Sequence, residues 1–183
     1  MTVTLDDKIA ALLQHVTECL HRARSPYVLI GAWALAAWGR PRATTDLDFL
    51  VLVNEEDLER LSEQMTRAGM ELDETWQTWN PMLRGFQIRF QSQGVTIDLL
   101  RSRDQHDQQV FQRKKKKRMD RRYYWVVSPE DFILQKLKVG RPRDFEDAIS
   151  VVERHQNGLD RAYLEHWARK LGVRDELIYI MAS

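Results

Sequence analysis

The chain has 183 residues, of which 43% are hydrophobic, and this size and composition are typical of one globular domain with a small extension. Its 28 basic and 27 acidic residues give a formal net charge of +1. This net charge by itself indicates neither a protein that binds nucleic acid nor one that binds acidic ligands. A single cysteine, Cys19, excludes an internal disulfide framework and a cysteine-rich zinc site.

The first predicted element is a helix over residues 4–23, where apolar residues recur at helical spacing. Residues 27–30 form a short apolar strand that ends at Gly31, and a helix of small residues follows over 32–38.

No apolar run approaches the roughly 18 residues of a membrane span, and the N-terminus lacks a secretory signal pattern. We therefore expect a cytoplasmic protein without a membrane partner.

The clearest buried strand covers residues 47–53, LDFLVLV. Asn54 is placed to cap a helix over 55–68. Gln93-Gly94 predicts a tight turn between two strands. The extended segments expected in this part of the chain cover about 71–79, 84–92 and 95–100.

The polar segment 101–122 is predicted to be helical or irregular, and residues 123–127 to form one more short strand. Ser128, followed by Pro129 and an acid three residues on, marks the start of a helical last third. The predicted fold class is α+β, with a short mixed sheet flanked by helices. We expect a catalytic core over 1–127 and a helical C-terminal region over 128–183 packed on it.

Three aspartates lie within apolar strand patterns. Strand alternation puts Asp46 and Asp48 on one side of their strand, about 7 Å apart. Asp98 lies in a second apolar strand, TIDLL. Carboxylates in such places are unfavourable unless a cation neutralises them, and a hard divalent ion such as Mg²⁺ does so with oxygen ligands. If the two strands are neighbours, the three acids form a metal site suited to phosphoryl or nucleotidyl transfer.

Gly31 stands at a strand-to-helix junction. Its missing Cβ lets a phosphate approach the backbone, and the following helix offers free N–H groups and the positive end of its dipole. The pattern predicts a phosphate-binding half of the site beside a metal-binding half.

At these residues the sequence resembles the DNA polymerase β-type nucleotidyltransferase superfamily. The matching residues are Gly31-Ala32, thirteen intervening residues, the run Asp46-Leu47-Asp48-Phe49, and Asp98. The run from Arg42 to Phe49, and a second block from Ser128 to Asp147, resemble small bacterial nucleotidyltransferases. These include the AbiEii-like toxin group, the minimal nucleotidyltransferases of toxin–antitoxin pairs, and aminoglycoside or lincosamide nucleotidyltransferases.

The resemblance implies a nucleotidyltransferase fold and the transfer of a nucleoside monophosphate from a nucleoside triphosphate (NTP) to a hydroxyl, with release of pyrophosphate. It implies Mg²⁺, with Mn²⁺ as the alternative, held by Asp46, Asp48 and Asp98; Asp98 is alternatively the base. The implied acceptor is RNA such as tRNA, a protein or a small molecule, and the implied protein partner is a cognate toxin or antitoxin. The candidate nucleotide contacts are Gly31, Ala32, Arg42, Thr45, Lys136 and Asp144.

Other interpretations stay open for individual residues. Arg42 also fits a basic surface turn, Lys136 an ordinary exposed helix position, and Asp144 a charge that balances neighbouring arginines. Ala32 departs from the Ser or second Gly of many members, which removes a hydroxyl contact to phosphate but keeps the backbone N–H. This favours, as the alternative function, a non-catalytic or weakly catalytic antitoxin-like binding module. A phosphodiester hydrolase that uses the same three acids is a third hypothesis.

The segment 113–122 holds eight basic residues and one acid. It fits a solvated helix end or flexible loop, or a surface that captures RNA phosphates, a nucleotide or an acidic partner. The adjacent aromatic residues 123–125 suit either base stacking or a core strand. Trp76 and Trp79 are expected to pack in the core, with an acceptor pocket as the alternative. The five histidines show no metal-ligand spacing.

Overall fold

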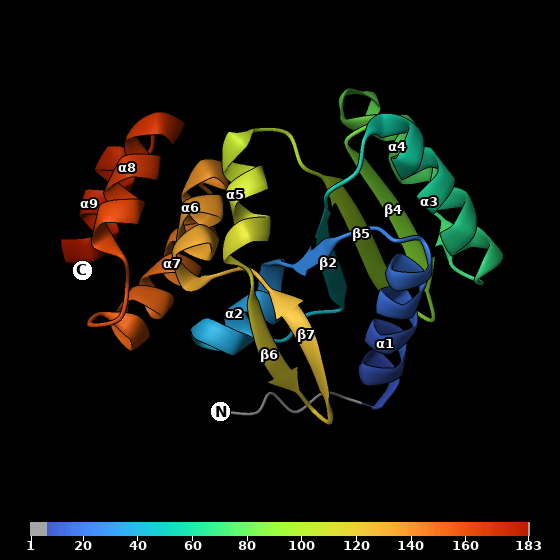
Figure 1. Ribbon diagram of the computed structural model, residues 1–183, viewed down its shortest axis with the longest axis horizontal. Coiled ribbons are helices and arrows are strands. Elements are labelled where there is room, and N and C mark those ends of the chain that lie inside the picture. Colours follow the sequence, from blue (N-terminus) through green and yellow to red (C-terminus); the bar gives the residue numbers. More distant parts are fainter. Residues whose placement is uncertain (1–6, 183) are drawn as a thin grey trace.

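The computed structural model describes residues 7–182 and contains a seven-stranded mixed sheet (Figure 1). The strands are β1 (Tyr27–Leu29), β2 (Asp46–Val51), β3 (Glu71–Leu72), β4 (Gln87–Ser92), β5 (Val95–Arg101), β6 (Lys115–Met119) and β7 (Arg122–Val126). They are arranged in the order β3-β4-β5-β2-β1-β7-β6. Two neighbouring pairs are parallel, β2 with β5 and β1 with β7, and the other neighbours are antiparallel.

Helices surround the sheet. They are α1 (Asp7–Arg22), α2 (Gly31–Trp38), α3 (Glu55–Arg67), α4 (Glu74–Trp79), α5 (Gln105–Arg113), α6 (Pro129–Val139), α7 (Pro142–His155), α8 (Arg161–Leu171) and α9 (Arg174–Ala182), with a short 3₁₀ turn at Pro81–Leu83. Residues 4–6 of the first predicted helix lie outside the described residues. In Figure 1, α1, α3 and α4 lie at one end of the molecule, and α6 to α9 lie together at the other. The predicted α+β class is confirmed.

The two central strands, β2 and β5, contribute fully buried residues to the hydrophobic core. Leu47 and Phe49 of β2 and Ile97 and Leu99 of β5 are all 0% exposed. These four residues share one face of the sheet, which packs into the core, and the aspartates lie on the other face. The aspartates of β2 and β5 therefore lie next to buried apolar residues on both strands.

The helix starts predicted from capping residues are confirmed. Asn54 accepts a hydrogen bond from the backbone N–H of Asp57 at the start of α3. Ser128 does the same for Asp131 at the start of α6, with Pro129 in the first turn. The helices α6 to α9 follow from there, so the last third of the described chain is helical.

The predicted extended segment over 71–79 is wrong beyond its first two residues. Only Glu71–Leu72 pairs as a strand, and Glu74–Trp79 forms α4. The physical reason is Asp73, whose carboxylate accepts a hydrogen bond from the backbone N–H of Trp76 and so starts a helix. Trp79 is 80% exposed, so its predicted packing in the core is also wrong.

The basic segment is a strand, and the predicted helical or irregular conformation is wrong for Lys115–Met119. These residues pair with β7 through a two-residue turn at Asp120 and Arg121, where Asp120 adopts a positive φ of 51°. The pairing partner explains why this basic segment is extended, because β7 is rich in aromatic and β-branched residues that favour a sheet.

Within the described part of the chain, no helix is both long and apolar enough to cross a membrane.

Candidate active site

The parallel pairing of β2 with β5 brings the three predicted aspartates together. Asp48 lies directly opposite Asp98 in the register, and Asp46 lies opposite Thr96. Register partners share a face of the sheet, and so do residues two apart on one strand, so all three carboxylates project from the same face. Asp46 is exposed, Asp48 is half-buried, and Asp98 is only 6% exposed.

The closeness of these carboxylates perturbs Asp48. Burial, together with the negative charges of Asp98 and Asp46, raises the pKa of Asp48 from 3.8 to about 6, although Lys136 and Arg89 act in the opposite direction. Among residues 7–182, the side chains of Asp46 and Asp48 have no hydrogen-bond or ion-pair partner. The site therefore carries negative charge that the protein itself compensates only in part.

Asp98 differs from the other two acids because Arg89 of β4 binds it. The Arg89 Nε and Nη2 atoms donate to the two oxygens of Asp98 at 2.9 and 2.7 Å. The guanidinium also lies 4.5 Å from the centre of the Trp76 ring. Arg89 was missed by the sequence interpretation, although the predicted turn at Gln93-Gly94 would have placed it opposite Asp98 in the hairpin register. Asp98 is thus held in a fixed orientation and is already neutralised.

Gly31 lies against Asp48. Its φ is +64°, and a Cβ at this position would collide with the Asp48 carboxylate. The space left by the missing Cβ is therefore occupied by the Asp48 carboxylate, and a phosphate contact at Gly31 stays a prediction. Gly31 begins α2, whose N-cap residue Ile30 offers no side-chain hydrogen bond, and the Ala32 side chain is buried. A phosphate contact with this turn would have to come from backbone N–H groups.

A second charged cluster joins the C-terminal helices to the β2 region. Lys136 of α6 lies 2.8 Å from a carboxylate oxygen of Asp144 and 2.8 Å from one of Asp147, both on α7. Arg42 lies 3.5 Å from Asp147. Thr45 is exposed, and its carbonyl accepts a hydrogen bond from the backbone N–H of Thr96. The structure thus pairs Lys136 with two carboxylates, Asp144 and Asp147, a contact that the sequence did not predict.

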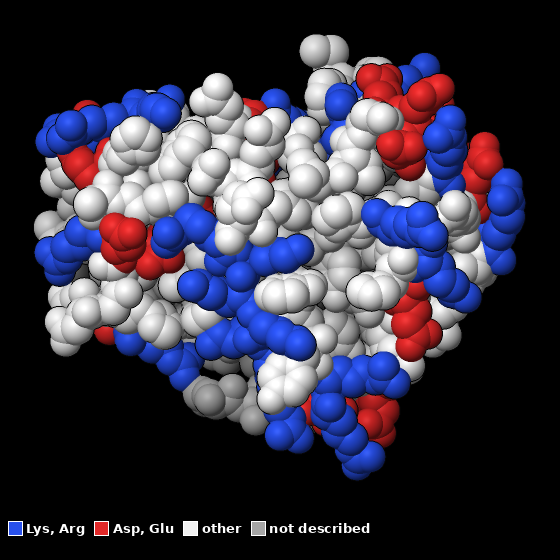
Figure 2. Space-filling view, in the orientation of Figure 1, with Lys and Arg blue, Asp and Glu red and all other residues white. Residues whose placement is uncertain are grey.

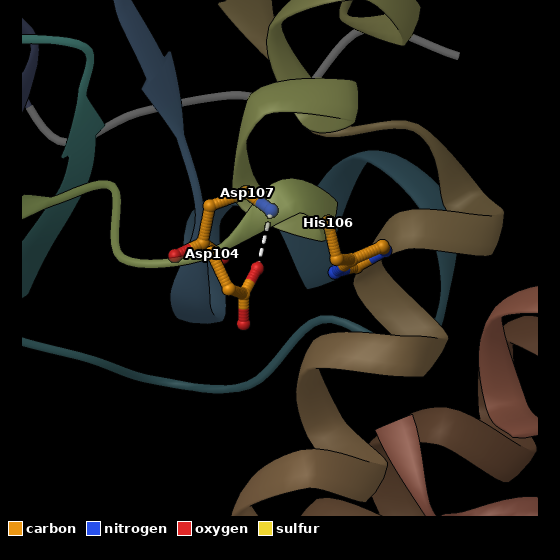
Figure 3. Close-up of side chains that lie close together, drawn as sticks. All are labelled: Asp104, His106 and Asp107. Atoms are coloured by element: carbon orange, nitrogen blue, oxygen red, sulfur yellow. Dashed lines mark hydrogen bonds between the residues drawn. The ribbon is translucent and has the colours of Figure 1, made fainter. Parts of the chain in front are cut away.

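Another group of possible metal ligands lies at the start of α5. Oxygen or nitrogen atoms of Asp104, His106 and Asp107 lie within 4.8 Å of one another, a proximity that the spacing of the histidines did not predict (Figure 3). Each carboxylate already has partners. Asp104 accepts from the backbone N–H of Asp107, and Lys138 lies 2.7 Å from Asp104 and 3.5 Å from Asp107. Since the Lys138 ammonium compensates both acids, the group acts as a helix cap with its own counter-ion.

Comparison with known proteins identifies the family. Residues 12–179 match the family described as "Nucleotidyl transferase AbiEii toxin, Type IV TA system". The chain belongs to the AbiEii nucleotidyltransferase family. The resemblance predicted from the two sequence blocks is therefore confirmed. No curated protein matches the sequence of this AbiEii-family chain.

Solved structures similar to this AbiEii-family chain share its fold. The antibiotic-resistance factor ANT(2'')-Ia is 14% identical, with a TM-score of 0.58 over 96% of this chain and 98% of that chain. The lincosamide antibiotic adenylyltransferase LnuA is 12% identical, with a TM-score of 0.55 over 82% and 98%. An antigenic nucleotidyltransferase-like protein from Paracoccidioides brasiliensis is 15% identical, with a TM-score of 0.56 over 97% and 93%. These likenesses confirm the predicted nucleotidyltransferase fold.

Proposed function

We propose that the protein transfers a nucleoside monophosphate from an NTP to a hydroxyl acceptor, in a reaction that depends on a divalent cation. The observation that supports this most strongly is the register of β2 with β5, which groups Asp46, Asp48 and Asp98 on one face of the sheet. In the reaction, the acceptor oxygen bonds to the α-phosphorus, the bond between that phosphorus and the bridging oxygen breaks, and pyrophosphate leaves. The hydroxyl proton passes to a base.

The donor set fits Mg²⁺ or Mn²⁺. All the donors are carboxylate oxygens, and Asp46 and Asp48 have no partner of their own among the described residues. A bound divalent cation would supply charge neutralisation for the triphosphate and lower the pKa of an attacking hydroxyl. Asp46 and Asp48 would hold it, while Asp98, oriented by Arg89, would be the third ligand or would accept the acceptor's proton.

We assign the triphosphate to the surface between α2 and the Lys136 cluster. Gly31 and Ala32 would offer backbone N–H groups, and Arg42, Thr45 and Lys136 would contact phosphate oxygens. Asp144 and Asp147 would position the Lys136 ammonium, since both lie 2.8 Å from it. The division into a catalytic core over 1–127 and a packed helical region over 128–183 is part of this proposal, because Lys136 would complete the site from the second region.

The test is transfer of label from each α-³²P-labelled NTP to RNA, protein or small-molecule acceptors in the presence of Mg²⁺. We expect transfer by the wild type and by Asp175→Asn, an exposed carboxylate on α9 that serves as the matched control. Asp48→Asn should abolish it. Equal transfer by Asp48→Asn would contradict the proposal. Release of free nucleotide without an acceptor would favour the hydrolase, and stable nucleotide binding without turnover would favour the binding module.

The family also bears on a protein partner. Because the matching family is described as the toxin of a type IV toxin–antitoxin system, we propose a cognate antitoxin protein as a partner. Co-expression with the neighbouring gene product should change the label transfer or the toxicity of the chain in cells. Unchanged transfer and unchanged growth would argue against that partner.

A further inference from the structure

The β6–β7 hairpin and the residues just before it carry a dense run of positive charge. Residues 113–122 hold eight basic residues and one acid, a net charge of +7, while the chain as a whole has a net charge of only +1. The other 173 residues are therefore net acidic, at −6. Figure 2 shows Lys and Arg side chains gathered over the lower centre of the molecule, where Figure 1 places the β6–β7 hairpin.

Most of this charge has no counter-ion. The residues at the two ends of the segment are paired, Arg113 with Glu130 at 3.0 Å and Arg122 with Glu18 at 3.8 Å. The five consecutive basic residues between them, 114–118, form no ion pair with any carboxylate in the described range 7–182. A run of cationic side chains without a carboxylate in ion-pair range attracts anions, because no neighbouring acid neutralises it.

Two exposed aromatic rings lie among these charges. In the hairpin register Lys116 is opposite Trp125 and Arg118 is opposite Tyr123, so these four side chains share one face. The Lys116 Nζ atom lies 5.5 Å from the centre of the Tyr123 ring and 6.0 Å from that of Trp125. Tyr123 is 61% exposed and Trp125 is 36% exposed. The buried residues of the hairpin are the register positions between them, such as Tyr124.

A purely structural role explains only part of this arrangement. β6 is the last strand of the sheet, and lysines on an edge strand prevent pairing with other chains. That role requires the charges, but it gives no reason to expose a tyrosine and a tryptophan between them. Aromatic residues exposed side by side among polar residues are typical of surfaces that bind a ligand or a partner.

We propose that the β6–β7 hairpin is a binding surface for single-stranded RNA. Lys114, Lys116 and Arg118 would contact successive phosphates, and unpaired bases would stack on Tyr123 and Trp125. Single-stranded RNA presents planar bases and phosphates in alternation, and the hairpin presents aromatic rings and cations in alternation, so the two surfaces match. An acidic protein would need only the cations. Stacking on Tyr123 and Trp125 requires unpaired bases, because the faces of bases in a duplex are already stacked on one another. We choose RNA because loops, bulges and ends give RNA unpaired segments.

The surface lies beside the proposed active site in the sheet. Lys115 is aligned with Val126, Val126 with Leu29, and Leu29 with Phe49, which follows Asp48. The start of β6 is therefore level with Asp48, three strand spacings or roughly 14 Å away across the sheet. Binding to the hairpin does not depend on nucleotidyl transfer, so the two proposals can fail separately.

The test is fluorescence anisotropy of a labelled, unstructured oligoribonucleotide of alternating A and C, with the full chain and no NTP. Two double variants separate the two kinds of contact. Lys116→Thr with Arg118→Thr removes charge, and Tyr123→Thr with Trp125→Thr removes rings; threonine keeps the strand propensity of the hairpin. The matched control, Arg60→Gln with Arg67→Gln, removes two exposed charges from α3.

We expect the charge variant to bind at least about tenfold more weakly and to show a smaller dependence of affinity on salt between ~50 and ~200 mM. The ring variant should lose roughly tenfold in RNA affinity, and the dependence of its affinity on salt should stay unchanged. RNA should quench the tryptophan fluorescence of the wild type, but not that of Trp125→Phe with Tyr123 intact. Tyr123→Phe with Trp125→Phe, which keeps both rings, should bind within about threefold of the wild type. The control should match the wild type.

Three results would overturn the proposal. The first is a charge variant that loses no more affinity than the control. The second is a ring variant that circular dichroism shows to be folded and that nevertheless binds RNA as tightly as the wild type and as Tyr123→Phe with Trp125→Phe. The third is polyglutamate binding as tightly as the RNA with the same dependence on the charge variant, which would assign the surface to an acidic protein partner instead.

Discussion

At the scale of single residues, the site is dominated by the electrostatic cost of Asp48. The pKa of Asp48 is about 6 in the folded protein, against an ordinary value of 3.8. A raised carboxyl pKa means that the folded state prefers the neutral acid, so stability is lost as the pH rises from ~4 to ~6 and stays lost above that range. The folded protein therefore bears a cost at neutral pH that a bound cation would relieve.

Asp48→Asn should stabilise the protein while it abolishes transfer. We expect its free energy of unfolding above pH ~7 to exceed that of the wild type by about 1–3 kcal/mol, with no difference below pH ~4. Urea denaturation at both pH values measures this. Asp175→Asn should show no difference at either pH. A destabilised Asp48→Asn at neutral pH would show that the carboxylate makes favourable contacts which outweigh its repulsion.

Arg89 is the second residue whose role can be measured. Arg89→Met leaves the buried Asp98 carboxylate without its two hydrogen bonds. We expect a loss of roughly 2–3 kcal/mol in unfolding free energy, somewhat less than for a fully buried pair because the Arg89 side chain is 27% exposed. The double variant Arg89→Met with Asp98→Asn should recover much of this loss. Additive losses in the double variant would mean that the two residues act independently.

At the scale of elements, helix α6 depends on its N-cap residue, Ser128. Ser128 is 0% exposed, accepts a hydrogen bond from the backbone N–H of Asp131, and donates one to the Asp131 carboxylate at 2.6 Å. This cap also orients an acid that binds His106 of α5 and Tyr163 of α8. The cap therefore connects three helices.

Ser128→Ala should lower the free energy of unfolding by about 1–2 kcal/mol, because it removes the cap and leaves a buried carboxylate oxygen short of one donor. Thermal and urea denaturation measure the loss. The matched control is Ser62→Ala in the interior of α3, which should be neutral or slightly stabilising. A loss at Ser128 no larger than at Ser62 would show that the rest of the sequence specifies the start of α6.

Elements also differ in how well local sequence predicts them. The central strands and α3 follow from apolar periodicity and a capping asparagine, and these predictions are confirmed. The segment over 71–79 was predicted wrongly, because one cap at Asp73 outweighs the extended pattern around it. The basic strand β6 was also predicted wrongly, because its conformation comes from the cross-strand partner and not from its own residues.

At the scale of the whole molecule, the C-terminal helices are an integral part of the fold. The backbone N–H of Arg40 donates to the Ser150 hydroxyl of α7, and Arg154 of α7 donates to the carbonyl of Gly39. Phe132, Ile133 and Leu134 of α6 are at most 1% exposed. The interface between the two proposed regions is thus both hydrogen-bonded and apolar.

A chain that ends at Val127 should therefore fail to fold cooperatively. It would expose the surface that α6 now covers, and it would lose Lys136, which lowers the pKa of Asp48. Size-exclusion chromatography and a thermal melt of this fragment test the expectation. A monomeric fragment with a sharp melting transition would show that residues 1–127 form an independent domain.

The sequence by itself determined the family, the fold class and the three aspartates, because a D-x-D on a buried strand and a distant strand aspartate are readable without coordinates. The tertiary structure decided three things that depend on which strands are neighbours. It put Asp98 opposite Asp48, it bound Asp98 to Arg89, and it filled the space beside Gly31 with the Asp48 carboxylate. Strand pairing joins residues far apart in the chain, and local periodicity carries little information about which strands will pair.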